Sequence, residues 1–159
     1  MTSSLLPVIG KPAPDFTLPS TTGEPISLRS FKGKKTVILY FYPKDETPGC
    51  TREACDFRDQ SAEFEKFDTV ILGVSTDNLE SHGKFRDKHH LPFPLLADED
   101  ATVAKQYGVY KQRNLYGKKY MGIERTTFVI DRTGRIAQIY PKVKVEGHIP
   151  QLLEFVGGD

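Results

Sequence analysis

The fold is decided by residues 36–50, which read TVILYFYPKDETPGC. The first seven residues form a continuous β-branched, aliphatic and aromatic run that Pro43 ends. Such a run is typical of a strand buried on both faces at the centre of an α/β sheet. A helix is predicted over residues 48–66, after a short loop, because Thr47 is a good N-cap and Pro48 suits the first helical position.

The sequence outside this stretch continues the alternation of strands and helices. A second apolar run predicts a strand over residues 70–75, and the polar segment after it predicts a helix over residues 78–90. Near the carboxyl end, two apolar runs flank residues 131–134, whose sequence DRTG is typical of a hairpin turn with glycine at positive φ. The other expected elements are strands at 15–18, 93–96, 126–130 and 135–140, and helices at 100–107 and 149–156.

This order of elements predicts an α/β protein with a thioredoxin-like fold. Its central β-sheet is expected to be mixed, partly parallel and partly antiparallel, and to be flanked by helices. The sequence contains no internal repeat and no linker rich in glycine or serine. A chain of 159 residues, 38% of them hydrophobic, suits one core. Residues 1–159 are therefore expected to form a single domain.

Composition argues against several classes of protein. The chain has 22 basic and 21 acidic residues, so its net charge of +1 gives no reason to expect nucleic acid or an anionic membrane as partner. No stretch approaches the roughly 20 apolar residues that span a bilayer. Residues 1–10 lack the basic region of a secretory signal, and Pro7 interrupts their apolar run. We therefore expect a cytoplasmic protein, in which two cysteines are more often catalytic, metal-binding or inert than structural.

Cys50 is expected in the first turn of the helix that starts at Pro48. Unpaired N–H groups and the helix dipole favour an anion at this end, and hence a thiolate over a thiol. Gly49 allows other groups to approach the backbone closely. The competing interpretation is a small buried hydrophobic residue, which is common for cysteine. The order Thr-Pro-Gly-Cys favours the activated nucleophile.

Cys55 follows Cys50 by five residues on the same predicted helix. In a continuous α-helix such positions differ by about 140° around the axis, and their Cα atoms lie roughly 8.6 Å apart. A disulfide needs a Cα separation of about 4.4–6.8 Å. The two cysteines therefore cannot form a disulfide while the helix is intact, and any redox cycle between them requires local unwinding. The alternative is that Cys55 simply faces the core.

Residues 42–55, which read YPKDETPGCTREAC, resemble the active-site segment of peroxiredoxins. The pattern Pro-x-x-x-Thr-x-x-Cys of that family is matched at Pro43, Thr47 and Cys50. The segment is most similar to the bacterioferritin comigratory protein, or peroxiredoxin Q, subfamily. The resemblance extends over nearly the whole chain, from the GKPAPDF of residues 10–16 to the ERTTFVID that ends at residue 131.

The resemblance implies a role for each residue around the first cysteine. Cys50 would be the peroxidatic cysteine, whose thiolate attacks a peroxide oxygen and becomes a sulfenic acid. Arg125 would favour the thiolate and orient the peroxide, although a surface arginine at a strand start is the ordinary alternative. Thr47 would offer its hydroxyl to thiolate and substrate, Pro43 would shield the thiolate from water, and the N–H groups of Gly49 and Cys50 would bind the peroxide.

The resemblance also implies the rest of the cycle. Cys55 matches subfamily members whose resolving cysteine is five residues downstream, so the oxidised form would carry a Cys50–Cys55 disulfide. Glu53 would pair with Arg125, although a solvated helix glutamate is equally compatible with the sequence. Hydrogen peroxide or an organic hydroperoxide would be reduced to water or an alcohol. Thioredoxin, fed by NADPH, would restore the thiols of a monomeric enzyme without a metal or bound organic cofactor.

Two other functions remain open at this point. A thiol–disulfide oxidoreductase can share the fold, but such enzymes usually carry CxxC, which this chain lacks. A redox-sensing or binding module would use the same disulfide as a switch. The histidines, His82, His89, His90 and His148, make no metal-binding pattern with the cysteines.

Overall fold

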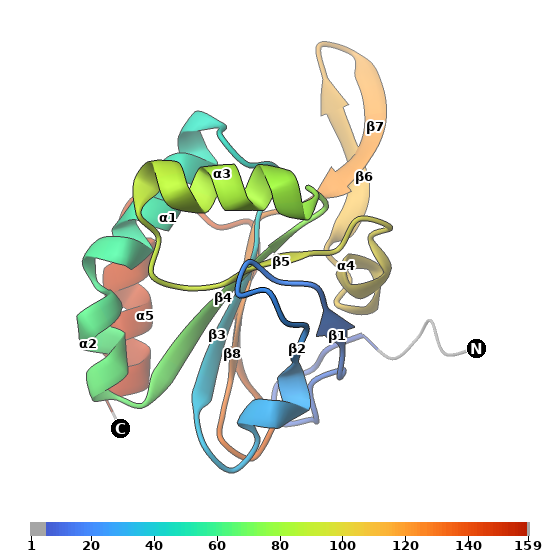
Figure 1. The fold of residues 1–159 in the computed structure, drawn as a ribbon. Coiled ribbons are helices and arrows are strands. Elements are labelled where there is room, and N and C mark those ends of the chain that lie inside the picture. The colour runs from blue at the N-terminus through green and yellow to red at the C-terminus, as the bar shows by residue number, and fades with distance from the viewer. Residues whose placement is uncertain (1–5, 159) are drawn as a thin grey trace.

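The computed structural model describes residues 6–158. Residues 1–5 and residue 159 lie outside the described residues. Part of the prediction about a secretory signal refers to residues 1–5. At the centre is a five-stranded sheet with the order β5-β4-β3-β8-β9 (Figure 1). These strands are Leu95–Ala97 (β5), Thr69–Ser75 (β4), Thr36–Phe41 (β3), Thr126–Ile130 (β8) and Ile136–Tyr140 (β9).

The sheet is mixed because its central strand, β3, has neighbours of opposite direction. β3 pairs in parallel with β4, which pairs in parallel with β5, and it pairs antiparallel with β8. β8 continues antiparallel into β9 through the predicted turn, where Gly134 has a φ of 85°. The predicted α/β, thioredoxin-like fold with a mixed central sheet is thereby confirmed.

One face of the sheet is covered by most of the helices. These are α1 (Pro48–Asp59), α2 (Ser61–Lys66), α3 (Leu79–His89) and α5 (His148–Gly157). Alternate side chains of β3, Ile38 and Tyr40, enter the core beneath them. The Tyr40 ring stacks on Phe57 of α1 with centroids 4.6 Å apart. This stacking fixes α1, which carries both cysteines, against the sheet.

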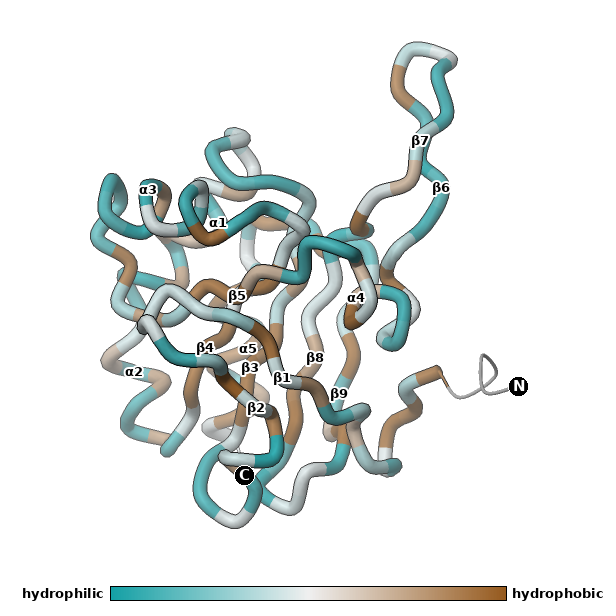
Figure 2. The backbone as a smooth tube through the Cα atoms, turned by 45° about the vertical axis from the view of Figure 1, so that its right-hand side comes forward, coloured by the Kyte–Doolittle hydropathy of each residue, from teal (hydrophilic) through white to brown (hydrophobic). Residues whose placement is uncertain are grey.

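The other face is covered by smaller elements. They are the two short strands Thr17–Leu18 (β1) and Ile26–Ser27 (β2), the 3-10 turn Leu28–Phe31 (η2), and the helix Thr102–Gln106 (α4). The remaining side chains of β3, Val37, Leu39 and Phe41, pack beneath them. Hydrophobic residues accordingly line the central strands, and hydrophilic residues predominate in α1, α3 and the surface turns (Figure 2).

One prediction about the elements was wrong. The helix predicted over residues 48–66 is interrupted at Gln60, whose φ and ψ of −111° and 9° leave the helical region. Both parts still bury a phenylalanine in one core, since the rings of Phe57 and Phe64 are 6.0 Å apart.

None of the described helices combines the length and the apolar character needed to cross a bilayer.

The structure also contains a hairpin that was not predicted from the sequence, Tyr110–Leu115 (β6) with Lys118–Ile123 (β7). It stands away from the rest of the molecule (Figure 1). Its turn residues, Tyr116 and Gly117, both have positive φ, as a two-residue hairpin turn requires. The strands are largely exposed, so they lack the alternation of apolar and polar residues that marks a half-buried strand.

The close contact of β4 with Tyr40 gives a test of the packing. A Cβ placed on Gly73 would lie 2.9 Å from Tyr40 Cζ and 3.0 Å from Leu95 Cδ2. We expect Gly73→Ala to lower the free energy of unfolding by about 1–3 kcal/mol, the usual effect of overpacking, in urea denaturation. The matched control is Gly83→Ala in α3, where nothing lies within 4 Å and alanine should stabilise the helix by about 0.5–1 kcal/mol. Equal stability of the two variants would contradict this packing.

Candidate active site

Cys50 lies where the central strand gives way to the first helix. β3 ends at Phe41, a loop follows, and α1 begins at Pro48, which places Cys50 in the first helical turn. Thr47 has the extended backbone of an N-cap, but its side chain makes no capping hydrogen bond. The Thr47 hydroxyl instead donates to the Lys44 carbonyl oxygen at 2.9 Å. The predicted N-cap position of Thr47 is therefore confirmed, but its side chain closes the preceding loop and does not cap the helix.

Arg125 reaches the sulfur from the neighbouring strand. Phe41, the last residue of β3, pairs with Thr126, the first residue of β8, so Arg125 lies beside the start of α1. Its Nη2 donates to Cys50 Sγ at 3.3 Å, and Cys50 is only 1% exposed. A Cβ on Gly49 would come within 3.1 Å of that nitrogen. Glycine at this position thus leaves the guanidinium room to approach the sulfur.

Glu53 holds the other side of the same guanidinium. Arg125 Nη1 donates to Glu53 Oε1 at 2.6 Å, and Glu53 is completely buried. Glu53 Oε2 has no hydrogen-bond partner among the described residues. Burial raises the pKa of Glu53 to about 7, although Arg125 opposes this shift. Burial works against the charge of Arg125, but Glu53 and Cys50 more than offset it and raise the arginine pKa.

The loop before α1 is anchored by a buried network that the sequence analysis missed. Asp45 Oδ1 accepts from the Tyr42 hydroxyl at 2.6 Å, and its Oδ2 lies 2.7 Å from Nδ1 of His82 on α3. His82 Nε2 faces the Leu96 carbonyl at 2.9 Å, so each of its ring nitrogens faces an acceptor. The residues lie far apart in the chain, and no spacing in the sequence reveals that they meet.

Asp45, His82 and Asp77 also have ligand atoms within 4.8 Å of one another. Their oxygens already accept protein donors, since the Ser81 hydroxyl donates to Asp45 at 2.8 Å and the Ser75 hydroxyl to Asp77 at 2.6 Å. The backbone N–H of Asp45 also donates to Asp77 Oδ2 at 2.8 Å. We interpret the cluster as a hydrogen-bonded support for the loop, because a cation would have to displace these donors.

Cys55 lies on the same helix as Cys50 but not beside it. Both cysteines are free, and α1 is continuous from Pro48 to Asp59. This unbroken helix is the arrangement predicted for the reduced chain. Cys50 is buried next to Arg125, whereas Cys55 is partly exposed and faces His89 of α3, whose Nδ1 is 4.0 Å from its sulfur.

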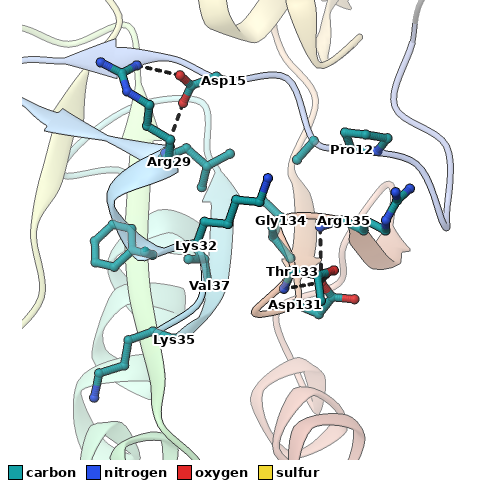
Figure 3. A pocket seen from close by; sticks show the side chains of 14 residues that line it. Pro12, Asp15, Arg29, Lys32, Lys35, Val37, Asp131, Thr133, Gly134 and Arg135 are labelled. Atoms are coloured by element: carbon teal, nitrogen blue, oxygen red, sulfur yellow. Dashed lines mark hydrogen bonds and ion pairs between the residues drawn. The ribbon is translucent and has the colours of Figure 1, made fainter.

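Two pockets differ in their relation to the cysteines. Pro43 and Arg125 border an open pocket whose other lining residues include Lys111, Arg113 and Lys142. A second pocket lies around the start of β3 and the turn after β8, at the opposite end of the sheet (Figure 3). Neither cysteine lines either pocket, but the first is bordered by Arg125, which donates to Cys50 Sγ, so we place the candidate site there.

A thioredoxin-like sheet with a free cysteine in the first helical turn, hydrogen-bonded to an arginine, defines a protein of thiol redox chemistry. The AhpC/TSA family matches residues 9–139. A putative peroxiredoxin Bcp of Coxiella burnetii is 55% identical over 91% of this chain and 95% of its own length. The peroxiredoxin Bcp of Bacillus subtilis is 51% identical over 92% of each chain.

Solved structures agree with these relatives. The bacterioferritin comigratory protein of Xanthomonas campestris superposes with a TM-score of 0.88 at 38% identity, over 95% of this chain and 98% of that one. A peroxiredoxin Q variant of Xylella fastidiosa gives a TM-score of 0.89 at 34% identity, over 96% of each chain. The chain belongs to the AhpC/TSA family, as a thiol peroxidase of the Bcp/peroxiredoxin Q type.

The buried Glu53 carboxyl predicts a pH dependence of stability. Its folded pKa of about 7 lies above the ordinary value of 4.5, so the folded state binds more protons between these pH values. The resulting stability is present below about pH 4.5 and is lost as the pH rises through 7. Relative to the wild type, Glu53→Gln should gain as much as about 3 kcal/mol across this range in urea denaturation. The exposed Glu65→Gln is the control, and parallel wild-type and Glu53→Gln profiles would contradict the assignment.

Proposed function

We propose that Cys50 is the peroxidatic cysteine of this enzyme and Cys55 its resolving cysteine. The observation that carries the proposal is the hydrogen bond from Arg125 Nη2 to Cys50 Sγ, 3.3 Å long, in the first turn of α1. A cation and a helix amino terminus both favour the thiolate, which is the nucleophilic form of cysteine. The 1% exposure of Cys50 keeps that charge away from bulk water, where these interactions would be weaker.

The first step is the transfer of one oxygen atom. The Cys50 thiolate attacks the terminal oxygen of a hydroperoxide, the O–O bond breaks, and Cys50 becomes a sulfenic acid. The alkoxide or hydroxide that leaves takes a proton and departs as alcohol or water. The Arg125 guanidinium stabilises the negative charge as it moves from sulfur to the leaving oxygen.

Three neighbouring residues complete the proposed peroxide site. Pro43 is half-buried at the pocket beside Arg125, where its ring limits the access of water to the sulfur. The Thr47 hydroxyl donates its proton to Lys44, so its free lone pairs are available to accept from the peroxide. The N–H groups of Gly49 and Cys50 are at the start of α1, where helical N–H groups have no partner within the helix.

The second step joins the two cysteines. The Cys55 sulfur attacks the Cys50 sulfenic acid, a disulfide forms, and water leaves. The first turns of α1 must unwind for this attack, because the sulfurs cannot meet across five residues of intact helix. A thioredoxin-type dithiol protein, reduced ultimately by NADPH, then exchanges with the disulfide and restores both thiols. The chemistry proposed here uses thiols alone, without a metal or bound organic cofactor.

We further propose that the enzyme acts as a monomer in the cytoplasm, where dithiol reductants are kept reduced. Both hydrogen peroxide and organic hydroperoxides are proposed substrates. The pocket beside Arg125 is open, so a substituent on the peroxide would extend toward Lys111 and Lys142.

Single-turnover kinetics test the role of Cys50. The reduced protein is mixed with hydrogen peroxide and sampled by rapid-quench mass spectrometry. We expect oxidation of Cys50 at least about a hundredfold faster than that of a free thiol, and a loss of about 10²–10³-fold in Arg125→Gln. Cys50→Ser should abolish the reaction, and Cys55→Ser should retain it. A wild-type rate no faster than that of free cysteine would rule out the peroxidase site.

The resolving role has its own test. Oxidised Cys55→Ser should stop at the Cys50 sulfenic acid, which mass spectrometry detects after trapping with a sulfenic-acid reagent. Normal thioredoxin-supported turnover of Cys55→Ser would refute the assignment of Cys55.

Hydrogen exchange tests the unwinding of α1. Oxidation by one equivalent of peroxide should lower the protection of the α1 amides from residue 51 to residue 55, while the β3 amides stay protected. Cys50→Ser, treated in the same way, should show no change. Unchanged protection of α1 in a protein that contains the disulfide would contradict the helix-opening step.

A further inference from the structure

The thiol of Cys55 lies against a histidine that the proposed peroxide site does not use. His89, the last residue of α3, places Nδ1 4.0 Å from Cys55 Sγ. Its ring packs edge-on against Phe85, with centroids 5.2 Å apart and an angle of 76° between the rings. The His89 side chain is 18% exposed, so the ring has a restricted orientation with Nδ1 directed at the sulfur.

The second ring nitrogen of His89 faces a carboxylate. Nε2 is buried and lies 3.5 Å from Glu46 Oε1, without making a hydrogen bond to any described residue. Glu46 belongs to the loop before α1 and has a φ of 66°, a conformation that costs energy for a residue other than glycine. A carboxylate on this side favours the tautomer with a proton on Nε2, which leaves Nδ1 free to accept one.

Charged groups from three segments surround this pair. Lys88 of α3 lies 3.6 Å from the same Glu46 oxygen. Arg58 of α1 lies three residues after Cys55, pairs with Asp59 at 3.0 Å, and donates from Nη1 to the His89 carbonyl at 2.8 Å. The last contact ties the carboxyl half of α1 to the end of α3. When α1 opens, its free end is therefore the Cys50 end, and Cys55 stays beside His89.

We propose that His89 is the general base of the resolving step, with Glu46 as the residue that positions it. The inference rests on the proposed roles of the two cysteines and adds a proton acceptor to them. Nucleophile, base and carboxylate occur here in the same order as in nucleophile–histidine–carboxylate triads, in which a neighbouring base activates a weak nucleophile. Contacts that are long in the resting enzyme shorten when the reacting groups meet.

The step balances without another reactant. His89 Nδ1 takes the proton of the Cys55 thiol, and the thiolate attacks the sulfur of the Cys50 sulfenic acid. The S–O bond of Cys50 breaks as the S–S bond forms, and the hydroxide that leaves takes one proton from the histidine or solvent to become water. The Cys55 sulfur is thereby oxidised and the Cys50 sulfur partly reduced.

A purely structural histidine at this position would behave differently. A cation at a helix carboxyl terminus and an edge-on aromatic contact stabilise the fold, and their loss lowers the stability of every state of the protein. Neither interaction changes the way in which the rate of disulfide formation depends on pH. The buried Nε2 without a hydrogen bond argues against a purely structural role, because it costs stability where it stands.

The experiment measures the rate of disulfide formation separately from the rate of peroxide attack. Reduced full-length protein is mixed with one equivalent of hydrogen peroxide, and rapid-quench mass spectrometry separates thiol, sulfenic acid and disulfide over time between pH 5.5 and 8.5. For His89→Gln we expect disulfide formation at pH 7 to be at least about tenfold slower than in the wild type, since a side chain without a titratable nitrogen accepts no proton. The variant's rate should rise about tenfold per pH unit, as hydroxide must then supply the thiolate.

Two further variants sharpen the result. His90→Asn changes the adjacent exposed histidine, whose φ of 53° asparagine tolerates, and should resolve at the wild-type rate. Glu46→Gln should slow resolution by less than His89→Gln does. Urea denaturation of each variant measures any loss of fold stability separately.

The possible outcomes distinguish the proposed roles of the two cysteines from the proposed role of His89. A wild type that forms no disulfide overturns the proposed roles of the cysteines themselves. A wild type that forms it, with a His89→Gln rate within twofold and the same pH profile, overturns the role of His89 alone. Equal slowing in His90→Asn and His89→Gln would likewise assign the effect to the end of α3 rather than to the base.

Discussion

The antiparallel register between β3 and β8 is the constraint on which the site depends. Because Phe41 pairs with Thr126, the residue before β8 stands beside the residues that follow β3, and Arg125 meets the first turn of α1. A shift of one residue in this register would turn the arginine to the opposite face of the sheet. Glu53, one turn further along α1, accepts a hydrogen bond from the same guanidinium.

Several features around this contact cost stability. Glu53 is fully buried with one carboxylate oxygen unpartnered, and Glu46 holds a left-handed backbone in the loop before the helix. The surrounding structure supports them through the stacking of Tyr40 on Phe57 and through the hydrogen bonds that anchor Asp45 to α3. Unfavourable local conformations of this kind persist where a rigid frame over-determines them, and they concentrate at functional sites.

The sequence predicted those parts of the molecule that depend on local patterns. The buried run of β3 and the Thr-Pro-Gly-Cys helix start were sufficient to predict the α/β architecture and the position of Cys50 in the first turn of a helix. The residue spacing was sufficient to predict that Cys50 and Cys55 cannot form a disulfide as long as the helix between them is intact. Local patterns do not predict contacts between distant segments. Neither the support of Asp45 by His82 nor the approach of His89 to Cys55 follows from any spacing along the chain.

The 1% exposure of Cys50 has a consequence for the order of events in a catalytic cycle. With α1 closed, the buried sulfur can be approached by the peroxide group of a small molecule, whereas another protein is too large to touch it. In the proposed cycle, a disulfide would open the helix and present the sulfurs to a protein, and no thiolate would be left to meet an oxidant. One helix would thus sort two co-substrates by size and admit them alternately, as a ping-pong enzyme requires, without a second binding site.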